Sequence, residues 1–430
     1  MIRFGRPGQD NLLSKTKTNG GKGVPGMKIL LGGVPFGCDN IGDEAILASV
    51  IALLRGICPE AELIVSTGDR SGTERKFGLK TVPLYGFDPA VPASRLGEAL
   101  DSIDFYVWAG ATGLSDYPEM ACTLLETAQA RGVRTIVWGV GMNDTFNPAF
   151  FTLHGKKKKL TDAVRACTGL DLEKRWIERR LQTIRQRLAR DLGRCDLIVL
   201  RDPKSLEVLR LCAPFPEAIA GADTAILQKQ CPPEALPWNE SERALFQSAS
   251  ARMAVCVSEQ NRIREFDEFT CWLDGMLEKH SGLLIVTIPM NPKTDFRVME
   301  EMKRRSKHPD RILSTRFLEP EEVQAVAADC SVIVSSRLHL LILGLNNLVP
   351  GVGIARGSKI EYFLSRFGLT TAGTTDNLDL PRLTESVERA LARRDEFRRH
   401  AETVRAEMLA DLDKAAALLK RTLNSMPQNK

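Results

Sequence analysis

Two polar segments, each following an apolar run, carry the residue types best suited to chemistry. The segment SSRLH, which ends at His339, follows the run SVIV, and RGSK, which ends at Lys359, follows the run VPGVGIA. The apolar runs are typical of buried strands, and the leucine-rich stretch after His339 is typical of a helix. In an open α/β sheet the ends of such strands line the ligand crevice. One imidazole, two guanidinium groups and one ammonium group there predict a site for an anionic substrate.

Polar and small residues also follow the other apolar runs of the chain. Such residues allow backbone N–H groups and helix N-termini to approach an anion. A tight turn explains any single glycine among them equally well, so it is their recurrence that predicts a crevice. The further candidate site residues are Asn40, Gly42, Asp43, Glu44, Gly110, Asn143, Arg201, Arg262 and Ser336.

His339 is the one histidine of five that sits in an apolar frame at a strand end. This position, beside Arg337, favours a functional imidazole over a structural one that caps the following helix. For Arg337 the structural alternative is an ion pair at the sheet edge. For Lys359 it is a solvated side chain in the first turn of a helix, where the helix dipole does not favour a cation.

Composition excludes several classes of protein. The chain has 430 residues, 43% of them hydrophobic, and a net charge of +5, which is ordinary for a globular protein of two or three domains. Its ten cysteines form no CxxC pair and no zinc-like Cys/His spacing, so we expect reduced thiols in the cytoplasm and no bound metal. No apolar stretch approaches the roughly 20 residues of a membrane span, and the first residues lack an apolar signal core.

Strands and helices alternate in two series along the chain, which predicts two doubly wound α/β domains facing a cleft. A Pro-rich stretch without periodicity is typical of a linker, and the charged end of the chain is typical of a helical tail that braces both halves. We therefore divide the chain into a disordered tail at 1–26, an N-terminal domain at 27–227, a linker at 228–250, a C-terminal domain at 251–380 and a helical tail at 381–430.

A basic insertion at 146–195 interrupts the first alternating series. HGKKKKL predicts a basic loop, whereas the stretch 172–192 predicts a long helix, because apolar residues recur there at spacings of three and four. The simplest interpretation is a helix packed on the domain with a solvated basic face. The alternative is a surface for peripheral association with a membrane or another polyanion. Nucleic acid is disfavoured because aromatic residues do not alternate with the charges.

Seven segments of the chain resemble one known family, that of the polysaccharide pyruvyl transferases. The Asn-x-Gly-Asp-Glu start and the Arg-Leu-His element are the most specific of them. The segments are NIGDEAIL (40–47), AGATGLSD (109–116), WGVGMN (138–143), LRDPKSLEVL (200–209), GADTAI (221–226), SSRLHLLILGL (335–345) and GVGIARGSKIEYFLSRFGL (351–369).

The resemblance implies a fold like that of the two-domain glycosyltransferase B class, and transfer of a pyruvyl group from phosphoenolpyruvate to a pair of saccharide hydroxyls as a ketal. His339 is then the candidate acid for the methylene carbon of the donor, and Asp43 the candidate group that orients or deprotonates the acceptor. The saccharide, free or lipid-linked, would belong to cell-envelope or exopolysaccharide synthesis, and no cofactor is expected. The expected donor-binding residues are Arg337, Ser336, Lys359, Arg262 and Arg201, and the expected acceptor-binding residues are Asn40, Gly42, Glu44, Gly110 and Asn143.

Two alternatives remain open. A glycosyltransferase that uses a nucleotide sugar would share the fold, although the Asp-x-Asp spacing of Asp411 and Asp413 falls in a predicted surface helix, where residues i and i+2 point apart. The other is a catalytically inactive saccharide-binding protein, because Ala109 and Ala111 flank Gly110 where the family usually has a run of glycines.

Overall fold

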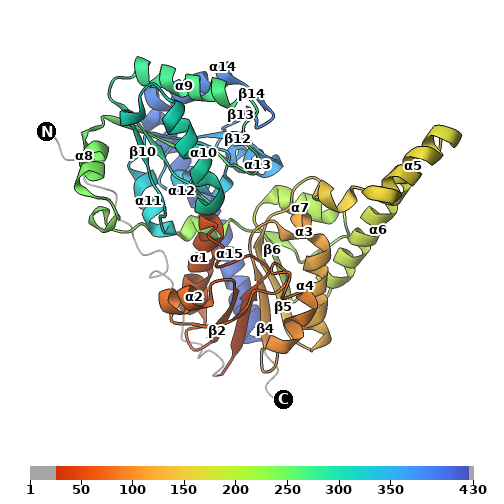
Figure 1. The fold of residues 1–430 in the computed structure, drawn as a ribbon. Helices are drawn as coiled ribbons and strands as arrows, with labels where there is room; N and C mark the ends of the chain where they lie inside the picture. Colours follow the sequence, from red (N-terminus) through yellow and green to blue (C-terminus); the bar gives the residue numbers. More distant parts are fainter. Residues whose placement is uncertain (1–25, 426–430) are drawn as a thin grey trace.

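The computed structural model of the protein describes residues 26–425, and the tail predicted at 1–26 lies outside them except for Gly26. Two seven-stranded sheets covered by helices form two domains, one above the other in Figure 1. The N-terminal sheet contains β1 (Lys28–Gly32), β2 (Glu62–Thr67), β3 (Lys80–Pro83), β4 (Phe105–Ala109), β5 (Arg134–Val140), β6 (Leu197–Leu200) and β7 (Ile219–Ala220). The C-terminal sheet contains β8 (Ala251–Cys256), β9 (Leu283–Thr287), β10 (Ile312–Ser314), β11 (Val332–Ser335), β12 (Gly351–Ala355), β13 (Thr371–Thr374) and β14 (Asn377–Leu378).

Both sheets have the same strand order, β3-β2-β1-β4-β5-β6-β7 in one and β10-β9-β8-β11-β12-β13-β14 in the other. All neighbours are parallel except β13 and β14. Strands such as β4, FYVWA, are apolar throughout because helices cover both faces of a parallel sheet. The order reverses direction between β1 and β4 and between β8 and β11, and ligand crevices open at the carboxyl ends beside such points. The predicted fold class is therefore confirmed.

Helices connect the strands in both domains. Those of the N-terminal domain are α1 (Ile41–Ile57), α2 (Arg70–Phe77), η2 (Ala93–Ala99), α3 (Gly113–Asp116), α4 (Pro118–Ala130), η3 (Pro148–Phe151), α5 (Gly155–Thr168), α6 (Leu172–Leu192), α7 (Pro203–Arg210) and η4 (Thr224–Leu227). Those that follow are η5 (Pro233–Ala235), α8 (Glu240–Ser248), α9 (Phe266–Lys279), α10 (Pro292–Arg305), η6 (Pro309–Arg311), α11 (Pro320–Ala328), α12 (Leu338–Asn346), α13 (Ser358–Ser365), α14 (Leu380–Ala392) and α15 (Arg394–Asn424).

The insertion differs from the prediction in one part. α6 has the predicted bounds, but the lysine-rich stretch predicted as a loop is helix α5, which ends at Thr168 and is capped by Gly169 with a φ of 71°. Lysine is a good helix former, so this stretch can be helical although no residue of α5 is buried.

The stretch predicted as an aperiodic linker contains an ordered helix. A capping box at the start of α8 joins Asn239 and Glu242, and Phe246 packs against Trp238 with 4.6 Å between ring centroids. Beyond the second sheet, α14 packs on the C-terminal domain, and α15 runs from there onto β6 and β7 of the N-terminal domain (Figure 1). No helix among residues 26–425 combines the length and the apolar character needed to cross a membrane.

Candidate active site

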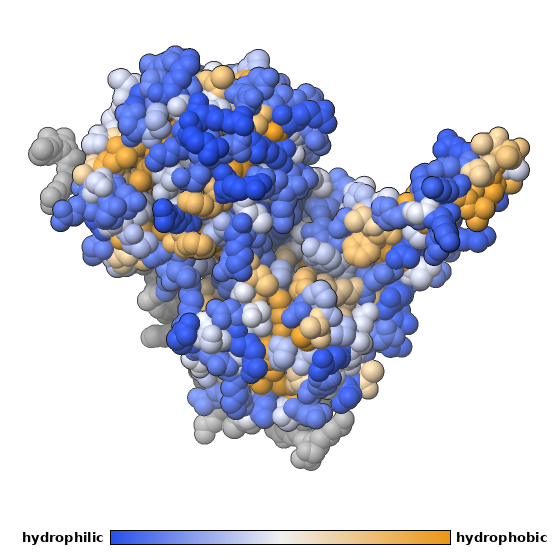
Figure 2. Space-filling model, in the orientation of Figure 1, coloured by the Kyte–Doolittle hydropathy of each residue, from blue (hydrophilic) through white to orange (hydrophobic). Residues whose placement is uncertain are grey.

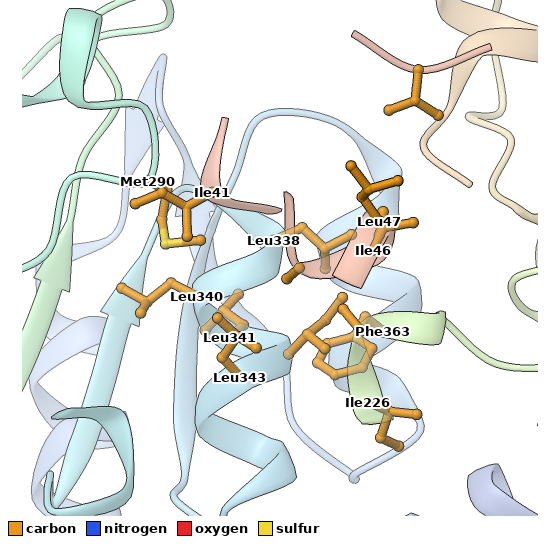
Figure 3. Close-up of a cluster of buried hydrophobic side chains, with 14 of the residues drawn as sticks. Ile41, Ile46, Leu47, Ile226, Met290, Leu338, Leu340, Leu341, Leu343 and Phe363 are labelled. Atoms are coloured by element: carbon orange, nitrogen blue, oxygen red, sulfur yellow. The ribbon is translucent and has the colours of Figure 1, made fainter. Parts of the chain in front are cut away.

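The start of helix α1 joins the two domains at the ends of their central strands. The amide of Ile41 donates to the carbonyl oxygen of Met290, which follows β9, at 2.9 Å. Figure 3 shows the apolar side chains around this junction, which come from α1, η4, α12, α13 and the loop after β9. This core fixes the polar ends of both sheets relative to each other.

His339 lies in the first turn of α12 and packs directly against the backbone of α1. A Cβ atom at position 42 would lie 2.1 Å from His339 Nδ1, closer than any side chain allows. Gly42 is therefore required where the two domains meet, because a side chain there would displace the imidazole. The two most specific segments of the sequence, Asn-x-Gly-Asp-Glu and Arg-Leu-His, thus come together in space.

The other nitrogen of the imidazole faces a carboxylate of the N-terminal domain. His339 Nε2 lies 3.6 Å from Asp223 Oδ2, beyond ordinary hydrogen-bond length, and both atoms are buried without a hydrogen-bond partner among residues 26–425. Burial would raise the pKa of Asp223, but His339, Arg201 and the amide of Ala225 together lower it below its usual value. Asp223 is therefore a buried carboxylate at neutral pH, aimed at the imidazole.

Two neighbouring acidic residues of α1 have raised pKa values: Asp43, which faces His339, and Glu44, which faces the loop at Gly37 and Lys76. Burial raises the pKa of Asp43 to about 6, although His339, Lys359 and a 2.7 Å hydrogen bond from Asn40 Nδ2 oppose the shift. Burial also raises the pKa of Glu44, to about 7, against a 2.7 Å hydrogen bond from the amide of Gly37. Asp43 therefore exchanges a proton near neutral pH, as a general base must, and Asn40 orients it.

Arg337, two residues before His339, points into the C-terminal domain. Its Nε and Nη2 donate to the two carboxylate oxygens of the fully buried Asp295, at 2.9 and 2.6 Å. The amide of Asn291 and the hydroxyl of Thr294 fill the remaining positions on that carboxylate. The structural alternative for Arg337, an ion pair at the sheet edge, is thus present. Among the described residues, Nη1 is the one nitrogen of this guanidinium without a partner, and it alone could bind a ligand.

Lys359 and Arg356 form a second cationic group at the end of β12. Burial lowers the pKa of Lys359, while Asp116 opposes the shift and the nearby Arg201 and Arg356 add to it. Burial, followed by repulsion from Arg337, lowers the pKa of Arg356 to about 10. Within the described residues, Lys359 Nζ makes no hydrogen bond or ion pair, and the buried Nε of Arg356 has no partner. These crowded cations have donors to offer to an anion.

The loop after β5 faces this cationic group from the N-terminal domain. Asn143 donates to Asp116 at 2.8 Å, and its buried Oδ1 is unpartnered in the part of the chain that is described. The amide of Asp144 donates to Ser358 Oγ at 3.4 Å, and Tyr362 OH also bonds to Asp144, so this loop touches α13 across the domains.

The predicted glycine-poor loop after β4 adopts a glycine-like backbone. Gly110 has a φ of 99°, and Ala111 follows it with a φ of 59°, a left-handed conformation that non-glycine residues rarely adopt. The carbonyl oxygen of Ala111 accepts from the amide of Gly141 at 2.7 Å. The substitution of alanine therefore leaves the loop in the shape that a glycine would take.

The three remaining predicted donor residues have different surroundings. Arg201 is buried against Gly141 and pairs with Asp202 at 3.2 Å and with Asp223 at 3.8 Å, so it belongs to the cluster but comes from the N-terminal domain. Ser336 accepts a hydrogen bond from the amide of Ser258 and braces the loop after β8. Arg262 pairs with Glu301 through two nitrogens and stacks on Phe266 at 4.0 Å, contacts that lie outside the cluster.

Three acidic residues of the cluster were not selected from the sequence: Asp223, Asp116 and Asp295. Asp223 follows a strand of two residues, too short to detect from an apolar pattern, although GADTAI was singled out as a segment. Asp295 lies in a helix first turn, where an acidic residue is unremarkable. The signal that identifies these residues is burial, which only the fold reveals.

Comparisons with known proteins identify the family and the type of fold. The sequence model for polysaccharide pyruvyl transferase matches residues 40–358, and a search of curated proteins finds no significant match. Among solved structures, UDP-GlcNAc 2-epimerase from Neisseria meningitidis bound to UDP-GlcNAc shares 13% identity over 92% of this chain and 99% of its own, with a TM-score of 0.57.

Two further structures have the same fold. A putative UDP-N-acetylglucosamine 2-epimerase from Listeria monocytogenes has 11% identity over 87% of this chain and 90% of its own, with a TM-score of 0.57. A UDP-glucose: anthocyanidin 3-O-glucosyltransferase in complex with UDP has 13% identity over 93% of this chain and 99% of its own, with a TM-score of 0.53. At such identities the likeness establishes the glycosyltransferase B type of fold alone. The match over residues 40–358, which include both segments that meet at Gly42 and His339, shows that the chain belongs to the polysaccharide pyruvyl transferase family.

Proposed function

We propose that the protein transfers a pyruvyl group from phosphoenolpyruvate to two hydroxyls of a saccharide, forming a ketal and releasing phosphate. The observation that carries the proposal is the group of crowded cations at the end of β12. Lys359 and Arg356 have unfilled donors and pKa values lowered by burial and by neighbouring cations. A donor with a carboxylate and a phosphate would supply the missing negative charge.

Reaction begins with a proton transfer to the methylene carbon of the donor. His339, held between Gly42 and Asp223, is the proposed acid, since the carboxylate of Asp223 stabilises an imidazolium. The new C–H bond converts the methylene group to a methyl group and leaves the neighbouring carbon as an oxocarbenium-like cation. That cation is open to attack by an oxygen nucleophile.

Two hydroxyls of the acceptor then replace the phosphate. The first bonds to the cationic carbon and gives its proton to Asp43, whose pKa of about 6 suits a base near neutral pH. Asp43 returns that proton to the phosphate as the C–O bond to phosphate breaks and the cation forms again. The second hydroxyl closes the ketal, and its proton restores His339. Asn40, which bonds to Asp43, and the bonded pair of Asn143 and Asp116 would orient these hydroxyls.

A thermal-shift comparison tests the choice of donor before the acceptor is known. Phosphoenolpyruvate should raise the melting temperature, and UDP-glucose and UDP-N-acetylglucosamine should not. Stabilisation by a nucleotide sugar and not by phosphoenolpyruvate would favour a glycosyltransferase. Phosphate release from phosphoenolpyruvate with a panel of saccharides, followed by mass spectrometry of the ketal, then tests turnover and separates an enzyme from an inactive binding protein.

A further inference from the structure

The helical hairpin formed by α5 and α6, residues 155–192, projects from the N-terminal domain. Figure 1 shows its end far from both sheets, with the turn between the helices at the tip. Only the last part of α6 is buried, at Ile184, Leu188, Asp191 and Leu192, and no residue of α5 is. A helix that packs on nothing but its partner gains little stability from burial, so its surface needs another explanation.

The hairpin concentrates the positive charge of the protein. Residues 155–192 contain twelve lysines and arginines and five acidic residues, a net charge of +7, whereas the whole chain carries +5. The rest of the chain is therefore negative, at −2. The positive charge is thus a local property of this element.

Three lysines in the first turns of α5 have no side-chain partner among residues 26–425. Lys158 is engaged with Asp162 and Glu173 at 3.1 and 2.5 Å, but Lys156, Lys157 and Lys159 are exposed and make no ion pair or side-chain hydrogen bond within the described residues. These side chains remain available to an anionic surface.

An apolar stripe runs beside the free lysines. Leu160, Ala163 and Cys167 are exposed at helical spacing on α5, and Leu170 is exposed in the turn at the tip. Leu160 and Leu170 are 65% and 45% exposed and make up two of the five large hydrophobic residues exposed in residues 26–425. Figure 2 shows orange, hydrophobic surface at the tip of the hairpin, next to blue, hydrophilic surface.

We infer that this hairpin docks the protein on the surface of an anionic lipid bilayer. Exposed leucines flanked by lysines are the composition of a helix that lies at a lipid interface, with its apolar side chains among the acyl chains and its cations among the headgroups. A second copy of the chain is a poorer partner, because its own hairpin carries the same +7 charge. Nucleic acid would satisfy the lysines but not the exposed leucines.

The root of the hairpin connects this surface to the candidate active site. Ile177 and Leu181 of α6 line a mostly apolar groove of about 290 Å³, with Arg185 at its side, and the groove extends to Asn143 and Asp144. A docked hairpin would hold this acceptor side of the site near the bilayer. The docking itself does not depend on the proposed reaction, so either can fail without the other.

Flotation of the full chain with lipid vesicles tests the inference. The protein should float with vesicles of phosphatidylcholine and phosphatidylglycerol, stay behind with phosphatidylcholine alone, and be released by high salt. Replacing Lys156, Lys157 and Lys159 with Ser should reduce the fraction bound by about tenfold or more. The pair Leu160→Ser and Leu170→Ser should reduce it at unchanged net charge, which a purely electrostatic contact would not show.

A matched control removes the same charge elsewhere. Arg304, Lys307 and Arg399 are exposed on or after α10 and on α15, and replacing them with Ser should leave flotation unchanged. Equal loss in this control would overturn the inference, as would wild-type protein that does not bind the anionic vesicles. Concentration-dependent dimers that the leucine variant dissociates, without vesicle binding, would instead assign the stripe to a second copy. Melting temperatures of all variants should match the wild type, because the replaced side chains are exposed.

Discussion

Two pairs of a basic side chain and a carboxylate meet the start of α12, and they differ in hydrogen bonding and in location. Arg337 and Asp295 form a closed pair inside the C-terminal domain, with two hydrogen bonds and every position on the carboxylate filled. His339 and Asp223 form an open pair between the domains, 3.6 Å apart, with both facing atoms unpartnered in the described chain.

The difference indicates separate roles for neighbouring residues. A closed, buried pair fixes the backbone that carries it but has little freedom to exchange a proton or a partner. An open pair leaves two buried polar atoms without a hydrogen bond, which costs stability. The distance between them can shorten when a substrate or a proton binds. Arg337 therefore positions the turn, and His339, two residues later, is left to act.

Loss of the imidazole should have the largest effect on activity. We expect His339→Gln to lower kcat about 10²–10⁴-fold, the usual range for a general acid, because the amide keeps a polar contact but has no proton to transfer. Affinity for phosphoenolpyruvate, measured by calorimetry, should stay close to that of the wild type. A variant that retains most of its turnover would reduce His339 to a structural residue.

Breaking the closed pair should instead lower the stability of the fold. Asp295→Ala leaves the Arg337 guanidinium without its buried partner and should lower the free energy of unfolding by about 3–5 kcal/mol in urea titrations. Asp223→Ala, the matched change in the open pair, should lower it by only about 1–2 kcal/mol, since it removes the hydrogen bond from the Ala225 amide and a longer ion pair to Arg201 but none to His339. Equal destabilisation by the two variants would contradict the distinction between the pairs.

Donor affinity should depend on the cations with unfilled donors. Lys359→Ala and Arg356→Ala should each weaken phosphoenolpyruvate binding by about 1.5–3 kcal/mol in calorimetry, as expected for hydrogen bonds to charged groups. Arg262→Ala is the control, because its guanidinium is already bound to Glu301. If only the control loses affinity, the donor site lies beside α9 and α10.

The smallest expected effect concerns the pH dependence of stability. Folding raises the pKa of Glu44 from its usual value of 4.5 to about 7, so the folded protein binds this proton more tightly than the unfolded chain does. The resulting stabilisation is fully present below about pH 4.5 and is lost as the pH rises through about 7. The melting temperature of the wild type should therefore fall by a few degrees from about pH 5 to about pH 8. Glu44→Gln does not titrate and should show a shallower fall; identical profiles would argue against the shift.

The architecture could be predicted from the sequence because parallel strands are long apolar runs. β1, β4, β5, β8, β9 and β11 are buried along nearly their whole length, and their regular alternation with helices leaves few arrangements of the chain. α5 could not be distinguished from a loop for the opposite reason. No residue of α5 is buried, and its run of four lysines is as typical of an exposed loop as of an exposed helix.

The cluster could be predicted only in part. Asp43, Lys359 and His339 follow strands that are plain in the sequence, and the structure brings them together. Asp223 follows a strand of two residues, and the choice of Asp295 as the partner of Arg337 is made by tertiary packing across 42 positions of the chain. Sequence patterns place a residue at a sheet edge; which neighbour it meets there depends on how the helices pack.

A double-mutant cycle tests most directly whether His339 and Asp223 act as one unit. Phosphate release from phosphoenolpyruvate in the presence of acceptor would be measured for His339→Gln, Asp223→Asn and the double variant. Because Asp223 acts through the imidazole, the double variant should be no slower than His339→Gln, within about threefold. If the two losses multiply instead, each residue acts on its own, and the open pair is not the catalytic unit.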